Sequence, residues 1–108
     1  MIVDVSQKLK NVKGEVVKDE KGTELSLKDL ILTAVDNGHE RGQVLSISDL
    51  STRKRIAFSV QSADGKVEMK SEDVTLIKQL ISRLPTNTGL YPTIAAIAID
   101  MVEPQSAE

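Results

Sequence analysis

One aliphatic stripe constrains this chain more than any other feature of its sequence. Val74, Ile77, Leu80, Ile81 and Leu84 recur at i, i+3, i+6, i+7 and i+10, which places their side chains on one face of an α-helix. Ser71, Glu72 and Asp73 precede the stripe, and such residues favour a helix start because they satisfy free N–H groups and the helix dipole. Pro85 follows it, so we expect the helix to end there.

Capping signals indicate two more helices. Ser26 precedes an apolar run with helical spacing, and Asp29 stands three residues later, as in a capping box. We expect this helix to stop at Asn37-Gly38, a pair that tolerates positive φ. A second helix is expected over 49–62, opened by Ser48-Asp49. Its inner side would carry Leu50, Ala57, Phe58 and Val60.

The first 25 residues contain β-forming segments separated by turn signals. The expected strands are roughly 2–5, 10–13 and 15–18. Gly14 would lie at a hairpin, and 18–22 would form a polar turn. An isolated hairpin is marginal in water, so this element must pack on the helices. A short extended piece is also expected at 66–70, where apolar and charged residues alternate.

The last expected helix begins near Tyr91-Pro92, runs through 93–102 and is apolar almost all the way round. Pro92 would stand in its first turn, and Pro104 follows its end. Such a helix is typical either of the centre of a fold or of a face shared with another subunit or partner. In the second interpretation the last two helices together form the interface. Its candidate contact residues are Ile77, Leu84, Ile94, Ile97 and Met101.

The composition favours one small α+β domain that is mainly α-helical. A chain of 108 residues is too short for two cores, so we expect a single globular domain over 1–103 and a flexible tail over 104–108. The core must be aliphatic, because Phe58 and Tyr91 are the only aromatic residues. The expected architecture is an N-terminal β-hairpin packed on about four helices.

Several classes of function are excluded by residue types that are absent or rare. The chain has no Cys, which excludes disulfide frameworks, thiolate metal sites and cysteine nucleophiles. A single His excludes multi-His metal centres. The longest apolar run is far shorter than a bilayer span, and the first ten residues lack the pattern of a secretory signal. We therefore expect a cytoplasmic protein.

The segment between the second and third expected helices resembles the calcium loop of EF-hands. Gly65 stands at the sharp turn, and oxygen-bearing side chains occupy ligand positions at Ser62, Asp64 and Glu68. The two strongest carboxylates are missing, because Val60 and Ser71 stand at the ends of the loop. We expect an EF-hand-like pair of helices without calcium, and no metal or cofactor.

Two charged features are candidate functional sites. Arg53-Lys54-Arg55 is a possible basic patch for nucleic acid or for an acidic protein, although consecutive helix positions fan out instead of forming one stripe. The net charge of −2 and the presence of only two aromatics argue against nucleic-acid binding. His39 beside Glu40 could act as a general base, but no nucleophile signature accompanies it. We therefore expect no catalytic site and no enzyme.

Several motifs together resemble a family of small proteins encoded by tailed bacteriophages and prophages. They are Leu9-Lys10, Gly14-Glu15, Lys18-Asp19, Leu27-Lys28-Asp29, Lys54-Arg55-Ile56-Ala57-Phe58, 67–78 and Tyr91-Pro92-Thr93-Ile94 with Ala98-Ile99-Asp100-Met101. The family has no settled activity and supplies no functional residues. The resemblance implies a non-catalytic protein-binding module of the bacterial cytoplasm, acting in virion or tail assembly as an adaptor, a chaperone or a self-associating protein. The alternatives are a host-directed inhibitor, with 37–48 as a contact loop, and a nucleic-acid-binding regulator.

Overall fold

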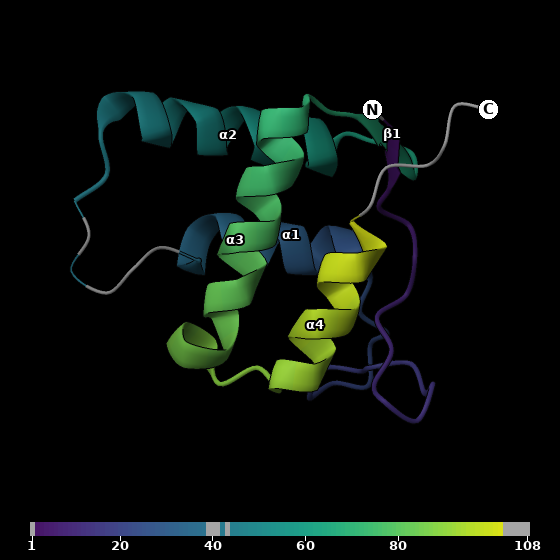
Figure 1. The fold of residues 1–108 in the computed structure, drawn as a ribbon. Helices are drawn as coiled ribbons and strands as arrows, with labels where there is room; N and C mark the ends of the chain where they lie inside the picture. The colour runs from purple at the N-terminus through teal and green to yellow at the C-terminus, as the bar shows by residue number, and fades with distance from the viewer. Residues whose placement is uncertain (1, 39–41, 43, 103–108) are drawn as a thin grey trace.

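Over the residues that the structure describes, the fold consists of four helices and one small sheet, in the order β1, α1, α2, β2, α3, α4 (Figure 1). The computed structural model describes residues 2–38, 42 and 44–102. The strands are β1 (Ile2–Asp4) and β2 (Lys66–Glu68), and the helices are α1 (Leu27–Asn37), α2 (Ile47–Gln61), α3 (Ser71–Thr88) and α4 (Pro92–Met101). The prediction of an α+β fold that is mainly α-helical is confirmed. The expected tail over 104–108 lies outside the described residues.

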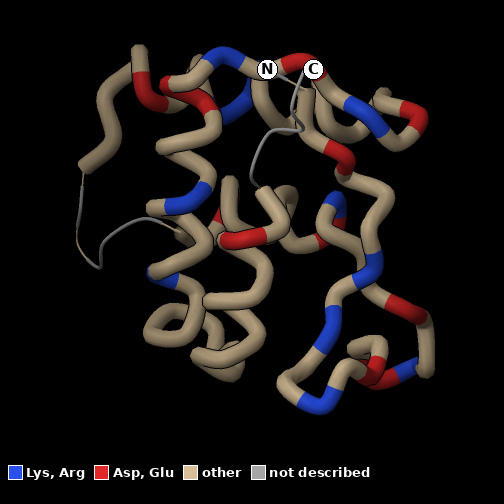
Figure 2. Tube along the Cα trace, turned by 45° about the vertical axis from the view of Figure 1, so that its right-hand side comes forward, with Lys and Arg blue, Asp and Glu red and all other residues tan. Residues whose placement is uncertain are grey.

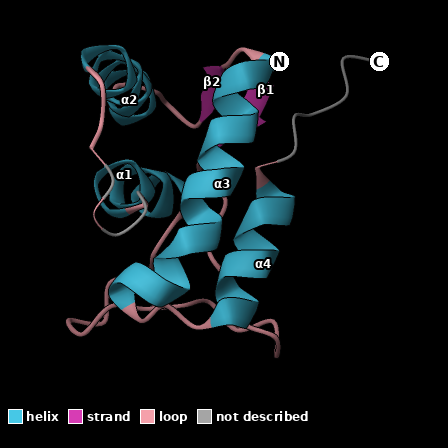
Figure 3. Cartoon of the chain, turned by 60° about the vertical axis from the view of Figure 1, so that its left-hand side comes forward, coloured by secondary structure: helices cyan, strands magenta, loops and turns pink. Residues whose placement is uncertain are grey.

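The helices form two crossing layers. α1 and α2 pack side by side, and α3 packs against both α1 and α4. Figure 3 looks nearly along the axes of α1 and α2 while α3 and α4 run across the view. The centre of the molecule therefore lies between α1 and α3, whose stripe Val74, Ile77, Leu80, Ile81 and Leu84 is buried as expected. α4, which one interpretation placed at the centre, lies at one side of α3.

Capping boxes start α1 and α2. In α1 the Ser26 side chain accepts a hydrogen bond from the Asp29 N–H, and the Asp29 carboxylate accepts one from the Ser26 N–H. In α2 the same pair of bonds joins Ser46 and Asp49, so the helix begins two residues before the expected start at 49. Ser46 and Ser48 both precede the apolar run, but Asp49 stands three residues after Ser46, which is the spacing that a capping box needs.

Gly38 ends α1 for a reason that differs from the expected one. Its φ is −88°, which any residue can adopt, so a left-handed conformation is not what favours glycine here. A Cβ atom at Gly38 would instead lie 2.6 Å from the Leu80 Cβ and from the Ala34 carbonyl oxygen. Helices α1 and α3 approach closely at this point, and only a glycine leaves room for both.

Helix α3 continues through Pro85 instead of ending before it. A proline removes the hydrogen bond to the carbonyl one turn earlier, and Figures 1 and 3 show the last turn swinging away from the axis of α3. The Thr88 hydroxyl donates to the Leu84 carbonyl oxygen at 2.9 Å and supports this turn. The helix ends at Gly89, whose φ of 76° is left-handed.

The strand β1 pairs with β2, which corrects the expected pairing within the N-terminal segment. The two strands are antiparallel, with Val3 opposite Val67, and both of these side chains are buried. The contact continues where the Val5 N–H donates to the Gly65 carbonyl oxygen at 2.6 Å. The loop between α2 and α3 therefore supplies a strand, as its alternating pattern predicted, but a segment more than sixty residues away completes the sheet.

Residues 8–26 form what we call the three-cornered element. Isolated antiparallel bridges join Lys8 to Ser26, Lys10 to Val16 and Lys18 to Glu24. Around the centre, the Val17 N–H donates to the Leu9 carbonyl, the Leu9 N–H to the Leu25 carbonyl and the Leu25 N–H to the Val17 carbonyl, each at 2.9 Å. Leu9, Val17 and Leu25 are spaced eight residues apart, so a short internal repeat underlies this closed triangle.

Two corners of the element are closed by equivalent turns. Asn11 Oδ1 accepts hydrogen bonds from the N–H groups two and four residues later, and Asp19 Oδ1 accepts the same two bonds in its own turn. Gly14 and Gly22 follow at φ values of 80° and 82°, where L-residues are strained. The hairpin predicted around Gly14 is therefore present as the first of these corners.

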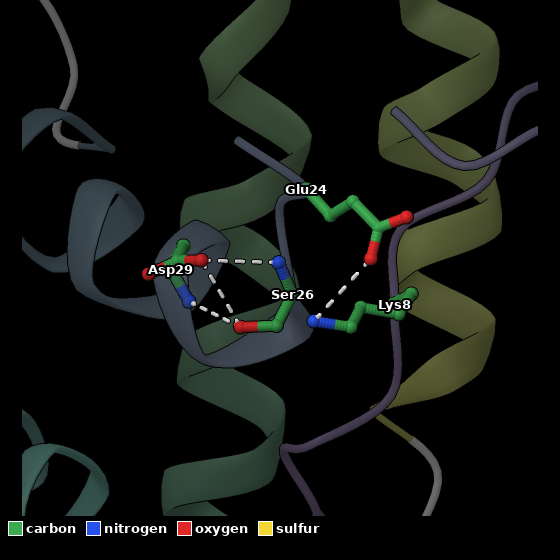
Figure 4. Close-up of polar contacts among 4 residues, drawn as sticks. All are labelled: Lys8, Glu24, Ser26 and Asp29. Atoms are coloured by element: carbon green, nitrogen blue, oxygen red, sulfur yellow. Dashed lines mark hydrogen bonds and ion pairs between the residues drawn. The ribbon is translucent and has the colours of Figure 1, made fainter. Parts of the chain in front are cut away.

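The third corner is where the chain enters and leaves the three-cornered element (Figure 4). Lys8 Nζ lies 3.9 Å from Glu24 Oε1 across the bridge between the two segments. Ser26 and Asp29 then start α1 directly after the corner (Figure 4). The Leu27 N–H donates to the Gln7 carbonyl oxygen at 2.7 Å, which fastens the first turn of α1 to the element.

A candidate protein-docking face on helix α2

Three of the five residues predicted to contact a partner lie inside this chain. Ile77 and Leu84 are fully buried in the core, and Ile94 retains only 6% of its exposure. A partner cannot reach Ile77 or Leu84 without unfolding α3, so these two residues are corrected to core residues. Ile97 and Met101 are partly exposed, but Met101 packs against the core. The apolar character of α4 thus serves mainly the fold.

The possible basic patch does not form, because its three residues have different surroundings. Arg53 is buried, and its Nη1 donates to the Val35 carbonyl oxygen at 3.2 Å. Arg55 makes two hydrogen bonds to the Asp73 carboxylate, at 2.9 and 3.0 Å. Lys54 is exposed and forms no ion pair with the described residues. Two of the three charges are therefore engaged within the chain, and nucleic-acid binding through this triplet stays a prediction.

The Arg55–Asp73 pair joins α2 to the first turn of α3. The hydrogen bonds from Arg55 lower the pKa of Asp73 below its usual value, although burial opposes this shift. The hydrogen bond to Asp73 raises the pKa of Arg55 in turn. Both groups are therefore ionised at neutral pH, and their charges cancel. Figure 2 shows Lys and Arg interleaved with Asp and Glu along the N-terminal segment as well.

An apolar surface that the sequence reasoning missed runs along the outer side of α2. Large side chains are exposed there at 83% for Ile47, 52% for Leu50 and 61% for Phe58. Ile47, Leu50, Lys54 and Phe58 recur at helical spacing on one side, opposite the buried Ile56 and Val60. We call Ile47, Leu50, Lys54 and Phe58 the α2 outer face. Leu50 and Phe58 were expected on the inner side of this helix, but they lie on the α2 outer face.

Position in the fold explains why this face is open. α2 packs against α1, and Figures 1 and 3 show it at the edge of the molecule, away from α4. Apolar residues occur on both sides of α2, so its sequence pattern alone does not reveal which side is covered. Arg53 marks the covered side of α2, because its long side chain lies inward and donates to a carbonyl oxygen of α1.

Two hollows lie along the α2 outer face. One, of about 390 Å³, is lined by Val35, Asp36, Leu45, Leu50, Arg53, Lys54, Ala57 and Phe58. The other, of about 310 Å³, is lined by Phe58, Gln61 and Ser62. Phe58 lines both, so its ring forms the ridge between them. The Lys54 ammonium lies 5.7 Å from the centre of that ring, within the range of a cation–π contact.

A larger hollow of about 840 Å³ lies elsewhere, between the second turn of the three-cornered element and the start of α4. Its apolar lining includes Val17, Leu90, Tyr91 and Ile94. Ile94, which was predicted to contact a partner, therefore borders this hollow. The rim at 18–21 carries two lysines and two acidic residues. Because these charges balance, the hollow offers no preference for a ligand of either sign.

The segment that resembles a calcium loop serves as a structural connection. Gly65 has a φ of 107°, and the following residues enter β2. Within the described part of the chain, no group of three or more His, Asp or Glu side chains is arranged to hold a metal ion. His39, the candidate general base, lies outside the described residues together with Glu40.

Comparison with protein-family models, curated proteins and solved structures finds no match to this chain. Among the helices of the described residues, none is long and apolar enough to cross a membrane.

Proposed function

We propose that this chain is a non-catalytic protein-binding module that docks a partner on the α2 outer face. The observation that carries the proposal is the exposure of Ile47, Leu50 and Phe58 on one side of a helix that packs against α1 with its other side. Contiguous exposed apolar surface on a small protein is typical of an interaction site.

The expected energetics depend mainly on Phe58. Burying one large apolar side chain contributes about 1.5–3 kcal/mol before the costs of association are subtracted. Aromatic residues at the centre of an interface often dominate its binding free energy, and Phe58 stands between the two hollows. Phe58 is therefore the residue whose substitution tests the proposal best.

The setting that we propose is the assembly of a phage virion or tail in the bacterial cytoplasm, with this chain as an adaptor or small chaperone. The support is the resemblance of its motifs to small phage proteins, together with a face that suits a protein partner. The host-directed inhibitor is the alternative, because it would use the same kind of surface against a bacterial protein.

The test compares two substitutions of the same type. Phe58→Asp places a charge on the α2 outer face. Val12→Asp places one in the first turn of the three-cornered element, at an apolar side chain that is similarly exposed, at 69%. We expect the wild-type chain and Val12→Asp to capture the same protein from lysate of phage-producing cells, and Phe58→Asp to lose it. Circular dichroism checks that both variants are folded.

The identity of the captured protein separates the two settings. A phage protein supports the assembly role, a host protein supports the inhibitor, and light scattering of the purified chain detects self-association. Equal capture by the two aspartate variants, or no capture by the wild-type chain, contradicts docking at this face.

A further inference from the structure

The shape of the α2 outer face limits how a partner can lie on it. The two hollows follow one another along α2 with the Phe58 ring between them. An occupant that lies along the helix can therefore place one apolar side chain on each side of Phe58. Amphipathic helices present anchors in this way, at intervals of three, four or seven residues.

A helix suits this surface better than an extended segment. The backbone N–H and C=O groups of α2 are used within the helix, so the face offers no strand edge to pair with. An extended peptide pressed on apolar side chains would leave its own backbone groups unpaired, which is costly. A helical occupant satisfies those groups internally.

The charges around the 390 Å³ hollow on the α2 outer face set a second condition. Arg53 and Lys54 line it with Asp36, so cations outnumber anions. Among the described residues, no carboxylate lies within ion-pair distance of Lys54. Arg53 is buried, and this burial lowers its pKa, with Asp49 opposing the shift and Arg83 adding to it. A carboxylate from outside would be favoured here.

A second copy of this chain fits the face poorly. Lys54 is the middle residue of Ile47–Gln61, so an antiparallel twofold pair of α2 helices would bring Lys54 against Lys54 of the partner subunit. Like charges at the centre of an interface oppose association.

We propose that the α2 outer face takes an amphipathic helix of another protein, with apolar side chains on both sides of Phe58 and a carboxylate facing Lys54. This inference rests on the proposed docking function and names the class of partner for it. The carboxylate of the partner helix lies beside Lys54 and away from Asp36, in the hollow that both residues line.

The experiment selects helices against purified, full-length chain. The probe is a displayed library of amphipathic helices of about 15 residues, the length of α2, with randomised apolar and polar positions. The targets are wild type, Lys54→Glu and Phe58→Asp, with Lys13→Glu as the matched control. Lys13 is an exposed lysine of the first turn, so its reversal changes the net charge equally at a remote place.

We expect helices selected on wild type to carry Asp or Glu beside their apolar face, and helices selected on Lys54→Glu to carry Lys or Arg. A synthetic peptide of the first pool should bind Lys54→Glu about fivefold more weakly or worse, the change expected for an exposed ion pair, and Lys13→Glu unchanged. It should bind Phe58→Asp more weakly still.

The alternatives can be distinguished. Selected helices that depend on Phe58 but show no acidic preference, or no response to Lys54→Glu, overturn this inference and leave the docking face intact. Helices that bind Phe58→Asp as well as wild type overturn both the inference and the proposed function, as does a library from which the wild-type chain selects nothing.

Discussion

At the scale of single residues, three neighbouring charges on α2 have three different roles. Arg53 lies inward and caps the Val35 carbonyl, Lys54 stands over the Phe58 ring, and Arg55 binds Asp73 on α3. Successive helix positions differ in direction by about 100°, so a run of like residues meets different surroundings. The sequence could show that the triplet fans out, but which member is buried depends on how α1 and α2 pack.

The Arg55–Asp73 pair leads to a prediction about pH. The folded chain holds the pKa of Asp73 below the reference value of 3.8. Because the pKa is lowered in the folded state, the pair's stabilisation is fully present above that reference value and is lost as the pH falls through the lower, folded pKa. We expect Asp73→Asn to lower the urea midpoint at pH 7, and its difference from wild type to narrow below about pH 3.8.

The matched control is Glu72→Gln, which removes an exposed acidic group from the same helix turn. Urea titrations of the three proteins across this pH range supply the comparison. A difference between wild type and Asp73→Asn that stays constant, or that widens in acid, would show that the ion pair is not its source.

At the scale of elements, local sequence patterns predict where a helix lies, but they do not predict which distant strands pair. Helix α1 begins where its capping box indicated, because a cap depends on neighbours within one turn. Helix α3 begins at Ser71, but its N-cap is Lys70 and no side chain caps it, so the expected capping by Ser71 is corrected. The partner of β1 was missed, since β2 lies far along the chain and no local pattern specifies it. The three-cornered element could have been found, because Leu9, Val17 and Leu25 repeat every eight residues with similar turns between them.

Equivalent turns in the three-cornered element predict equivalent energetic costs. Asn11 and Asp19 each accept two backbone hydrogen bonds with one side-chain oxygen. A net contribution of about 0.5–1 kcal/mol per exposed bond gives a loss of about 1–2 kcal/mol for either Asn11→Ala or Asp19→Ala. Chemical denaturation measures both losses, and Lys13→Ala at the tip of the first turn should change stability by less than about 0.5 kcal/mol.

A clear inequality between the two alanine variants would contradict the repeat as an energetic unit. If Asn11→Ala were neutral while Asp19→Ala remained costly, the negative charge of Asp19, and not the shared geometry, would account for the second turn.

At the scale of the whole molecule, the candidate site follows from the way the two layers are assembled. Both α2 and α3 pack against α1, whereas α2 packs against α1 with one side and leaves its other side open. Whether an apolar residue of α2 is core or surface is therefore decided by a helix that is distant in sequence. This is why Leu50 and Phe58 could be recognised as apolar but not as exposed.

The same arrangement predicts that α2 opens before the rest of the fold. Few of its side chains are buried, chiefly Ile56 and Val60, while α1 and α3 share the centre. Native-state hydrogen exchange should show a lower opening free energy for α2 amides than for α1 and α3 amides. Ile56→Ala should destabilise the chain by about 2–4 kcal/mol, and Phe58→Ala by less than about 0.5 kcal/mol. Uniform protection of all helices would mean that α2 is fixed as firmly as the core, and a docked partner would then meet a rigid face instead of one that binding must steady.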